Sequence, residues 1–508
     1  MSSSHVDFTG HWAGLLSVAV FVVAYVAIMA EEQLHLRKSV PALAAAGVMW
    51  LLVGSVLAWE GATAVTVEAA RHTILDFAEL FLFLLVAITY INTLTERGVF
   101  AAVHGRLVES GLSWRGLFWV TGLIAFAISA VAPNLTVALV LGSVVVALGR
   151  SNPRFAALAC INVVVASNAG GVFSPFGDIT TLLVWQSGRI PFEGFLPLFV
   201  PSLVNWLVPA IAMSVTIGPG APPRLRERTE MEDGAIAVIA LFLGTIALTV
   251  ALQNVLHLPP ALGMMFGLGL LKLYSYGFNR SGYQVTDLAN ELDNVFATPA
   301  IDERARDRPE TVVTEADSGP IAHAIGGTVN LLEPAPGGIT QSVARIASTP
   351  EPQRGRFSRA RRPLETFQLM EKIEWDTLIF FYGVIMAVGA LGVLGYLALA
   401  STALYVGLGP LTANILVGLA SAIIDNVPVM FAVLGMGPTM STGQWLLLTL
   451  TTGVGGSLLS IGSAAGIALM GQARGSYTFV AHLKWTWAIA LGYVASIATH
   501  LLLNQRLM

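Results

Sequence analysis

The sequence predicts an all-α protein that crosses a membrane many times. Hydrophobic residues fill 55% of its 508 positions, charged residues fill only 11%, and the mean hydropathy is +0.72. Soluble domains carry about 25% charged residues, whereas a helix that spans a bilayer needs about 20 mostly apolar residues. Many such runs are present here, so the class is a polytopic helical membrane protein.

Continuous apolar runs predict the uninterrupted spanning helices. They lie at 11–30, 40–58, 77–95, 194–217, 234–256, 259–276, 374–394 and 480–503. The first run has no Lys or Arg before it, so it lacks the basic region of a signal peptide and reads as a retained helix. The single cysteine, Cys160, excludes an intramolecular disulfide and gives no sign of a metal–thiolate centre.

Two further apolar regions are interrupted, and their interruptions match each other in the same order. The stretch "SAVAPNLTVAL" (129–139) resembles "SAIIDNVPVMF" (421–431). Likewise "SNAGGVFSPFGDITTLLV" (167–184) resembles "TGVGGSLLSIGSAAGIAL" (452–469). These two ordered matches predict an internal duplication, with one repeat in 1–217 and the other in 234–508.

The duplication predicts an inverted arrangement. In each repeat we expect a re-entrant hairpin, whose two arms enter and leave on one side, followed by an interrupted helix. Each repeat then crosses five times, which inverts the second against the first and gives about 10 crossings plus two hairpins. Regions 116–187 and 411–472 would each hold one hairpin and one broken helix.

Charge placement predicts the orientation. If the N-terminus lies outside, the outer loops hold only Arg71, Arg189 and Arg506, and the other loop cations fall inside. Positive charge is enriched in cytoplasmic loops. We therefore expect both termini in the periplasm of a bacterial inner membrane. The polar segment 277–371, which lacks the apolar content for a core, would be a cytoplasmic and largely flexible insertion.

The break between Ser167 and Asp178 predicts a cation site. Unwound backbone is tolerated in a bilayer only where it lines protein or a polar cavity. We expect Gly170, Gly171 and Gly177 to adopt conformations closed to other residues and to free carbonyls for a cation. Half-helix C-termini would add negative dipole character. Further oxygen ligands would come from Ser167, Asn168, Ser174 and Thr180.

Two carboxylates, Asp178 and Asp425, are the predicted ion-coupling and proton-carrying groups. Carboxylates in the middle of a membrane are costly and functional by default. The alternatives are structural: Asp178 as the N-cap of the following helix, and Asp425 as the residue that forms an Asx turn. Asn134 and Asn426 lie at the two predicted hairpin tips, where matched positions favour a paired role over turn formation.

Other polar residues have structural interpretations. Ser129 and Ser421 could back-bond within their helices as readily as take part in a site. Glu79 and Asp376 fall near predicted helix starts, where an acid complements the dipole. Finally, His257, His482 and Lys484 lie near predicted boundaries and could snorkel to the interface.

Three stretches resemble one known family. "FAELFLFLLVAITYIN" (77–92), "SNAGGVFSPFGDITT" (167–181) and "SAIIDNVPVM" (421–430) are similar to the NhaD-type sodium/proton antiporters of the ion transporter superfamily. The resemblance covers nearly all membrane segments. It implies a scaffold, formed mainly by 11–95 in the first repeat, and a moving transport domain that holds the hairpins and broken helices of 116–187 and 411–472. It also implies an elevator-like motion and a homodimer.

The resemblance also nominates sodium ligands at the hairpin tips and the facing loops. In this sequence they are Asn134 with Gly170, Gly171, Ser174 and Asp178, and Asn426 with Asp425, Gly455, Gly456 and Ser463. Superfamily symporters carry Ser-Asn-Thr at the tips, where this chain has Pro133-Asn134-Leu135 and Asp425-Asn426-Val427. A carboxylate in place of a neutral ligand disfavours an anionic substrate and favours cation/proton exchange.

The leading hypothesis is a secondary transporter, a Na⁺(Li⁺)/H⁺ antiporter that extrudes sodium with the proton gradient and needs no cofactor. A sodium-coupled anion or dicarboxylate symporter is the alternative within transport. An intramembrane aspartyl protease is the alternative of another class, because "FGD" resembles a Gly-Asp protease motif. Against the protease, the aspartates lie in differently broken elements, and no Tyr-Asp partner helix is visible.

Overall fold

The computed structural model describes residues 7–222, 231–296, 364, 366–371 and 373–508, which contain helices and no β-strand. The chain forms two compact units, residues 1–276 with 364–508, and residues 277–363. In the second unit the described residues, 277–296, continue the helix α12 (Pro260–Phe296). The predicted all-α polytopic class is confirmed.

In the described part of the chain, nine helices are long and apolar enough to cross a membrane, and one bent pair would make ten. Two of these ten, Asn134–Ser151 and the bent pair, belong to the predicted hairpin regions, and Pro260–Phe296 is not among them, so the predicted ten crossings remain a prediction. The long helices outside the two interrupted regions are α1 (Trp12–Met29), α3 (Ser39–Trp59), α4 (Thr63–Glu96), α10 (Phe199–Val215), α11 (Ala235–Leu256), α12, α15 (Trp375–Val393) and α22 (Thr486–Leu503). The bent pair is α16 (Tyr396–Ser401), which continues into the π-helical turn Thr402–Val406, followed by α17 (Pro410–Ala420).

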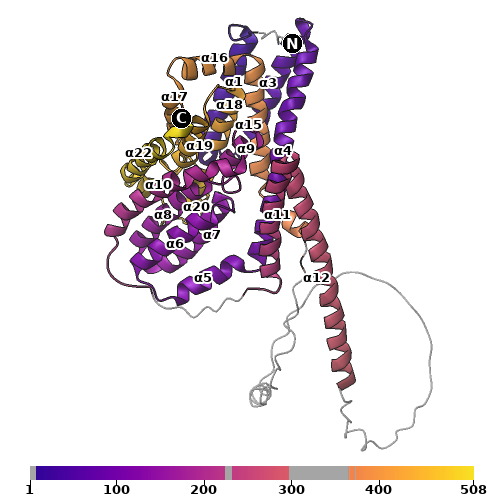
Figure 1. Cartoon of the computed structure of the whole chain (residues 1–508), viewed down its shortest axis with the longest axis vertical. Coiled ribbons are helices and arrows are strands. Elements are labelled where there is room, and N and C mark those ends of the chain that lie inside the picture. The colour runs from indigo at the N-terminus through magenta and orange to yellow at the C-terminus, as the bar shows by residue number, and fades with distance from the viewer. Residues whose placement is uncertain (1–6, 223–230, 297–363, 365, 372) are drawn as a thin grey trace, which may run out of the picture. The chain divides into compact units, whose positions relative to one another are not determined.

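Helices α1, α3, α4 and α15 pack against one another (Figure 1). Small residues let them approach closely, as is usual between membrane helices. A Cβ at Gly383 of α15 would lie 2.6 Å from the backbone of Ala42 in α3, and one at Gly389 would lie 2.7 Å from the Thr73 hydroxyl of α4. The core of this group includes Ala45, Met49, Val53, Ala387 and Ala390.

Both interrupted regions fold as pairs of helices with a break between them. The pairs are α6 (Trp114–Ile128) with α7 (Asn134–Leu148), α8 (Pro153–Gly171) with α9 (Ile179–Gln186), α17 with α18 (Asn426–Met436), and α19 (Thr442–Gly455) with α20 (Ala464–Gln472). The two regions interleave, because α7 packs on α20 and α18 packs on α9. This exchange brings the four breaks together.

Short helices complete the described chain. They are α2 (Glu31–Leu34), α5 (Val99–Glu109), α14 (Thr366–Glu371), α21 (Phe479–Leu483) and the 3₁₀ turns Gly149–Ser151, Phe192–Leu198 and Gln505–Leu507. Helix α12 extends past residue 276, where the predicted insertion begins. Residues 297–363 of that insertion lie outside the described residues.

Two sequence interpretations of polar residues are wrong. Glu79 is not near a helix start, because α4 begins at Thr63 and places Glu79 in its middle. His482 does not snorkel, because its side chain is fully buried. Asp376, in contrast, does lie in the first turn of α15, where it accepts a hydrogen bond from the Ser39 hydroxyl.

Candidate functional site

One cavity of about 140 Å³ brings together polar residues from both interrupted regions. Its lining includes Asn134, Asp178, Asp425, Asn426 and Ser463. Each of these residues caps or begins one of the four half-helices α7, α9, α18 and α20. The predicted half-helix C-termini are therefore not what lines the cavity. Helix N-termini do so, and they stabilise negative charge.

Asp178 is the most buried carboxylate of this cavity, with 4% of its surface exposed. One oxygen accepts from the Thr180 amide at 3.3 Å, so the predicted N-cap is present. Both oxygens also accept from the Asn426 side-chain amide, at 3.3 and 3.2 Å. Among the described residues no cation pairs with Asp178. A carboxylate thus lies in the protein interior with neutral donors alone, which is costly unless a cation or proton neutralises it.

Asp425 lies at the start of α18 and lines the same cavity as Asp178. Its carboxylate accepts from the Val427 amide at 3.2 Å, which is the predicted turn-forming contact. It is only partly buried. The two interrupted regions therefore contribute one carboxylate each, in different surroundings, and the exposed Glu374 before α15 is a third carboxylate of the lining.

Asn168 in the last turn of α8 links the two breaks. Its amide group donates to the Ser457 hydroxyl at 2.8 Å and to the Ser463 hydroxyl at 3.1 Å. Its carbonyl oxygen accepts from the Asn134 side chain at 3.1 Å. Asn168 does not line the cavity, and its polar atoms hold three surrounding elements in place.

The remaining predicted ligands lie behind the cavity wall. They are Ser167, Gly170, Gly171, Ser174, Thr180, Gly455 and Gly456, all of them buried. The Thr180 hydroxyl lies beside the Asp178 carboxylate and has no hydrogen bond of standard geometry among the described residues. Thr180 is therefore the best placed of this group to take a ligand.

The glycines of the breaks serve close packing, and the predicted unusual conformations are absent. None of Gly170, Gly171, Gly177, Gly455 and Gly456 has a positive φ. A Cβ at Gly170 would lie 2.2 Å from the Phe126 carbonyl oxygen, and one at Gly455 would lie 2.1 Å from the Gly418 carbonyl oxygen. The Gly177 carbonyl already accepts a hydrogen bond from the backbone N–H of Asn134, at 3.1 Å.

Ser129 and Ser421 make the same contact in the two regions. The Ser129 hydroxyl donates to the Ser167 carbonyl at 2.6 Å, and the Ser421 hydroxyl donates to the Thr452 carbonyl at 2.9 Å. Neither serine bonds back within its own helix. Both fasten the end of one half-helix to the last turn of another.

Sequence reasoning missed two residues that shape the breaks. The Thr181 hydroxyl donates to the Ser174 and Asp178 carbonyls, at 2.9 and 2.6 Å, and so closes the first break. In the second break, the Ser457 hydroxyl accepts a hydrogen bond from the Asn168 side-chain amide. A hydroxyl inside or next to each interruption was the available signal, and both residues fall within the quoted matching stretches.

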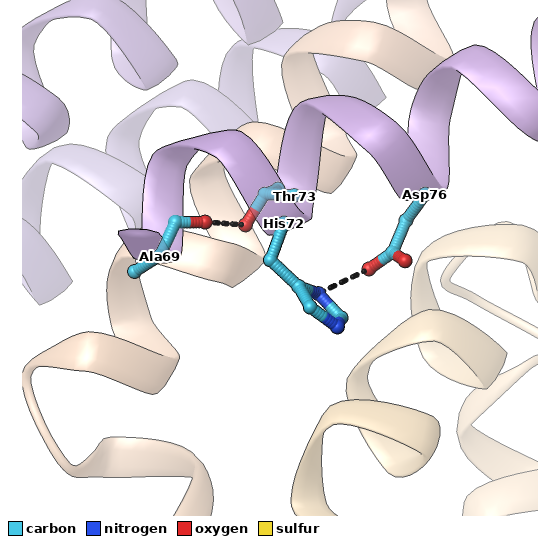
Figure 2. A network of polar contacts seen from close by, with 4 residues as sticks. All are labelled: Ala69, His72, Thr73 and Asp76. Atoms are coloured by element: carbon cyan, nitrogen blue, oxygen red, sulfur yellow. Dashed lines mark hydrogen bonds and ion pairs between the residues drawn. The ribbon is translucent and has the colours of Figure 1, made fainter. Parts of the chain in front are cut away.

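A second cavity, of about 730 Å³, lies along α4, α9, α15 and α18, which also contribute residues to the Asp178 cavity. Figure 2 shows two of its contacts on α4: His72 pairs with Asp76 at 3.2 Å, and the Thr73 hydroxyl bonds the Ala69 carbonyl. Glu79 and Arg189 also line this cavity. It shares no lining residue with the cavity at Asp178.

An apolar layer separates the two cavities. On α4, Leu80 lies between Glu79 of one cavity and Phe83 of the other and is fully buried. Val384 and Ile385 take the corresponding place on α15, and Met430 on α18, and all are buried. On these three helices, packed side chains therefore lie between the Asp178 cavity and the second cavity.

The fold and the cavity define a multi-pass membrane protein with a polar site built from broken helices, which is the architecture of secondary transporters. The family model described as "Citrate transporter" matches residues 25–294 and 359–453, well over half of the chain. Within that family the chain belongs to the NhaD-type Na⁺/H⁺ antiporters.

Relatives support this membership over the whole length. The Na⁺/H⁺ antiporter NhaD of Alkalimonas amylolytica is 47% identical over 506 residues, covering 100% of this chain and 94% of the relative. NhaD of Halomonas elongata is 46% identical over 503 residues, covering 99% and 91%. Sodium/proton antiporter 1 of Arabidopsis thaliana is 27% identical over 501 residues, covering 96% and 72%.

Proposed function

We propose that this protein is a Na⁺(Li⁺)/H⁺ antiporter of the bacterial inner membrane, which extrudes sodium with the inward proton gradient. The observation that carries this proposal is the buried Asp178 carboxylate, which has neutral donors and no cationic partner among the described residues. The names of the full-length bacterial relatives support the same activity.

Exchange follows from competition for one carboxylate. A proton or a sodium ion each neutralises Asp178, whereas the empty ionised form leaves a charge in a low-dielectric interior at a cost of several kcal/mol. Only the loaded forms then move readily through the membrane. Sodium binding requires proton release, so the two ions travel in opposite directions. Thr180 and Asn426 would add neutral oxygens to the cation shell, and Asp425 would carry the second negative charge.

The cavity chemistry weighs against an anionic substrate. Four helix N-termini converge on it, which would suit an anion, but Asp178 and Asp425 already place negative charge at two of them. No Lys, Arg or His is among the described residues that line this cavity. The relatives give no support to the aspartyl protease alternative, because they are named as antiporters.

Alternating access is the proposed transport mechanism. The Asp178 cavity and the second cavity would open to opposite faces of the membrane, with the apolar layer as the barrier between them. Helices α9 and α18 would move as part of a transport domain against α4 and α15 of the scaffold, in an elevator-like motion. The paired serine and glycine contacts of the two regions support the proposed inverted repeat. A homodimer, periplasmic termini and a cytoplasmic segment 277–371 complete the proposal.

Everted membrane vesicles test the function directly. After a proton gradient is established, added Na⁺ or Li⁺ should release protons from the lumen, because cations and protons compete for Asp178. The signal of a pH-sensitive dye should recover with Na⁺ and Li⁺ and stay unchanged with choline chloride. Vesicles without the protein provide the background. Proton release that requires citrate or another dicarboxylate together with Na⁺ would contradict the antiporter and favour the symporter.

Thiol labelling tests the two cavities. Thr377 lines the Asp178 cavity and Ser187 lines the second cavity. We expect T377C to react with a membrane-impermeant maleimide from the cytoplasmic face and S187C from the periplasmic face, in intact cells compared with everted vesicles. The native Cys160 is fully buried, so the unmodified protein should stay unlabelled and serves as the control. Labelling of both variants from one face would contradict the proposed access routes.

A further inference from the structure

His482 lies behind the second break, outside the cavity and outside every role described above. It belongs to the short helix α21, which precedes α22, and its side chain is fully buried. One ring nitrogen, Nδ1, lies 2.8 Å from the Tyr477 hydroxyl. The other, Nε2, lies 2.9 Å from the Ser457 carbonyl oxygen. Both polar atoms of the ring are therefore used, and one of them reaches the break itself.

The contact with Ser457 fixes the direction of the bond. A carbonyl oxygen can only accept, so Nε2 carries a proton and donates it to Ser457. The Tyr477 hydroxyl holds the opposite side of the ring, which sets its orientation. A rigid pair of side chains thus supports the backbone of the break from behind.

Ser457 passes this support to the ion site. Its hydroxyl accepts from Asn168, whose amide also reaches Ser463 and whose carbonyl oxygen holds Asn134. Asn134 and Ser463 line the cavity with Asp178. If the Ser457 backbone moved, the side chain of Asn168 would move with it and would displace Asn134 and Ser463 in the cavity wall.

The two breaks differ in how they are closed, and the difference explains why the second needs support from outside. In the first break the Thr181 hydroxyl bonds two carbonyls of the break. The position that matches Thr181 in the second stretch is Gly466, which has no hydroxyl. A larger residue would not fit there, because a Cβ at Gly466 would lie 2.2 Å from the Ser460 carbonyl oxygen.

We infer that His482, held by Tyr477, is a positioning residue of the ion site. It fixes the second break through its bond to Ser457. In this way it sets the geometry in which Asn168 holds Asn134 and Ser463. His482 touches neither the cavity nor the ion. Its loss should therefore weaken ion binding more than it slows transport at saturating sodium. This inference rests on the proposed cation exchange and adds a residue to its site.

His500 is a matched control. It is also fully buried, and its Nε2 lies 3.0 Å from the Gly443 carbonyl oxygen. Gly443 is in the first turn of α19, at the opposite end from the break. Replacement of either histidine removes one buried ring and one bond to a backbone carbonyl, but only His482 supports the break.

The experiment compares His482→Leu, His482→Gln, Tyr477→Phe and His500→Leu in everted vesicles, over a range of Na⁺ concentrations. We expect His482→Leu to raise the half-maximal Na⁺ concentration about tenfold, the usual effect of one lost buried hydrogen bond, with a nearly unchanged maximal rate. His482→Gln, which can still donate to Ser457, should restore most of the affinity. Tyr477→Phe should cause a smaller increase, and His500→Leu should leave the half-maximal concentration unchanged.

Several results would overturn the inference. These are an unchanged half-maximal concentration in His482→Leu, an equal shift in His500→Leu, or loss of maximal rate alone. If His482→Leu fails to fold, His482→Gln and Tyr477→Phe decide the question. A raised half-maximal Na⁺ concentration in Tyr477→Phe, without one in His482→Gln, supports the inference. An unchanged half-maximal concentration in Tyr477→Phe overturns it.

A second measurement does not require exchange. It is the rise in unfolding temperature of the purified full chain when NaCl is added instead of choline chloride. If the wild type shows that rise without exchanging protons, the proposed function fails, and the inference stands or falls on whether His482→Leu loses the rise.

Discussion

Asp178→Asn is expected to abolish Na⁺-driven proton movement and to leave a folded protein. Asn and Asp are about equally good N-caps, so the bond from the Thr180 amide to the cap side chain should persist and α9 should still begin at Ile179. The carboxylate is lost, and with it the buried negative charge for which the two ions compete in the proposed mechanism. The measurement is dye recovery in everted vesicles after Na⁺ addition, where the variant should match vesicles without the protein.

Two observations separate this expectation from simple misfolding. The variant should elute from size-exclusion chromatography as the wild type does and keep its unfolding temperature in Na⁺-free buffer, because burial of a neutral amide costs less than burial of a charge. Asp178→Glu should keep part of the activity with a changed half-maximal Na⁺ concentration, since the charge is retained but displaced. Exchange at the normal rate in Asp178→Asn would show that this residue is only a helix cap.

Asp425→Asn is the second change for which we expect complete loss of Na⁺-driven proton movement. The amide can still accept from the Val427 amide, so the start of α18 should be preserved. The charge that Asp425 brings to the cavity from the second interrupted region would be gone, and a cation bound between the two residues would keep only the Asp178 carboxylate as a negatively charged ligand. The same vesicle assay measures the loss, with Asp425→Glu as the charge-preserving control.

The two carboxylates also make a prediction about charge movement. If each releases one proton when one sodium ion binds, exchange moves net charge, and the wild-type rate should respond to an imposed membrane potential. A wild-type exchange rate that does not change with the imposed membrane potential would contradict the two-proton proposal. Normal Na⁺/H⁺ exchange in Asp425→Asn would remove Asp425 from the transport mechanism and leave it the role of a turn former.

The sequence by itself determined the class of the protein and the places where its helices break. Apolar runs of about 20 residues have one stable solution in a bilayer, because every backbone polar group must be bonded within the segment. Asp178 and Ser463 were recognisable as caps, since short side chains that accept from the next turn serve as helix starts. The matching stretches also placed Ser129 opposite Ser421 before their equivalent hydrogen bonds were seen.

Only the tertiary structure decided how those breaks are used. The glycines looked like residues chosen for unusual backbone angles, but Gly170 and Gly455 leave room for the carbonyl oxygens of neighbouring helices. A requirement for space depends on a partner that is distant in sequence, so a single stretch cannot reveal it. For the same reason Asn168 looked like a ligand, although its three bonds go to Asn134, Ser457 and Ser463.

The structure likewise decided which helix ends face the ion cavity. Each break has one C-terminal and one N-terminal end, and the sequence shows both without saying which one turns toward the cavity. The packing of α7 on α20 and of α18 on α9 places the N-terminal ends there, with Asp178 and Asp425 upon them. Local sequence sets where a helix begins and ends, because capping involves only neighbouring residues. The face that a break presents is set by contacts between segments far apart in the chain.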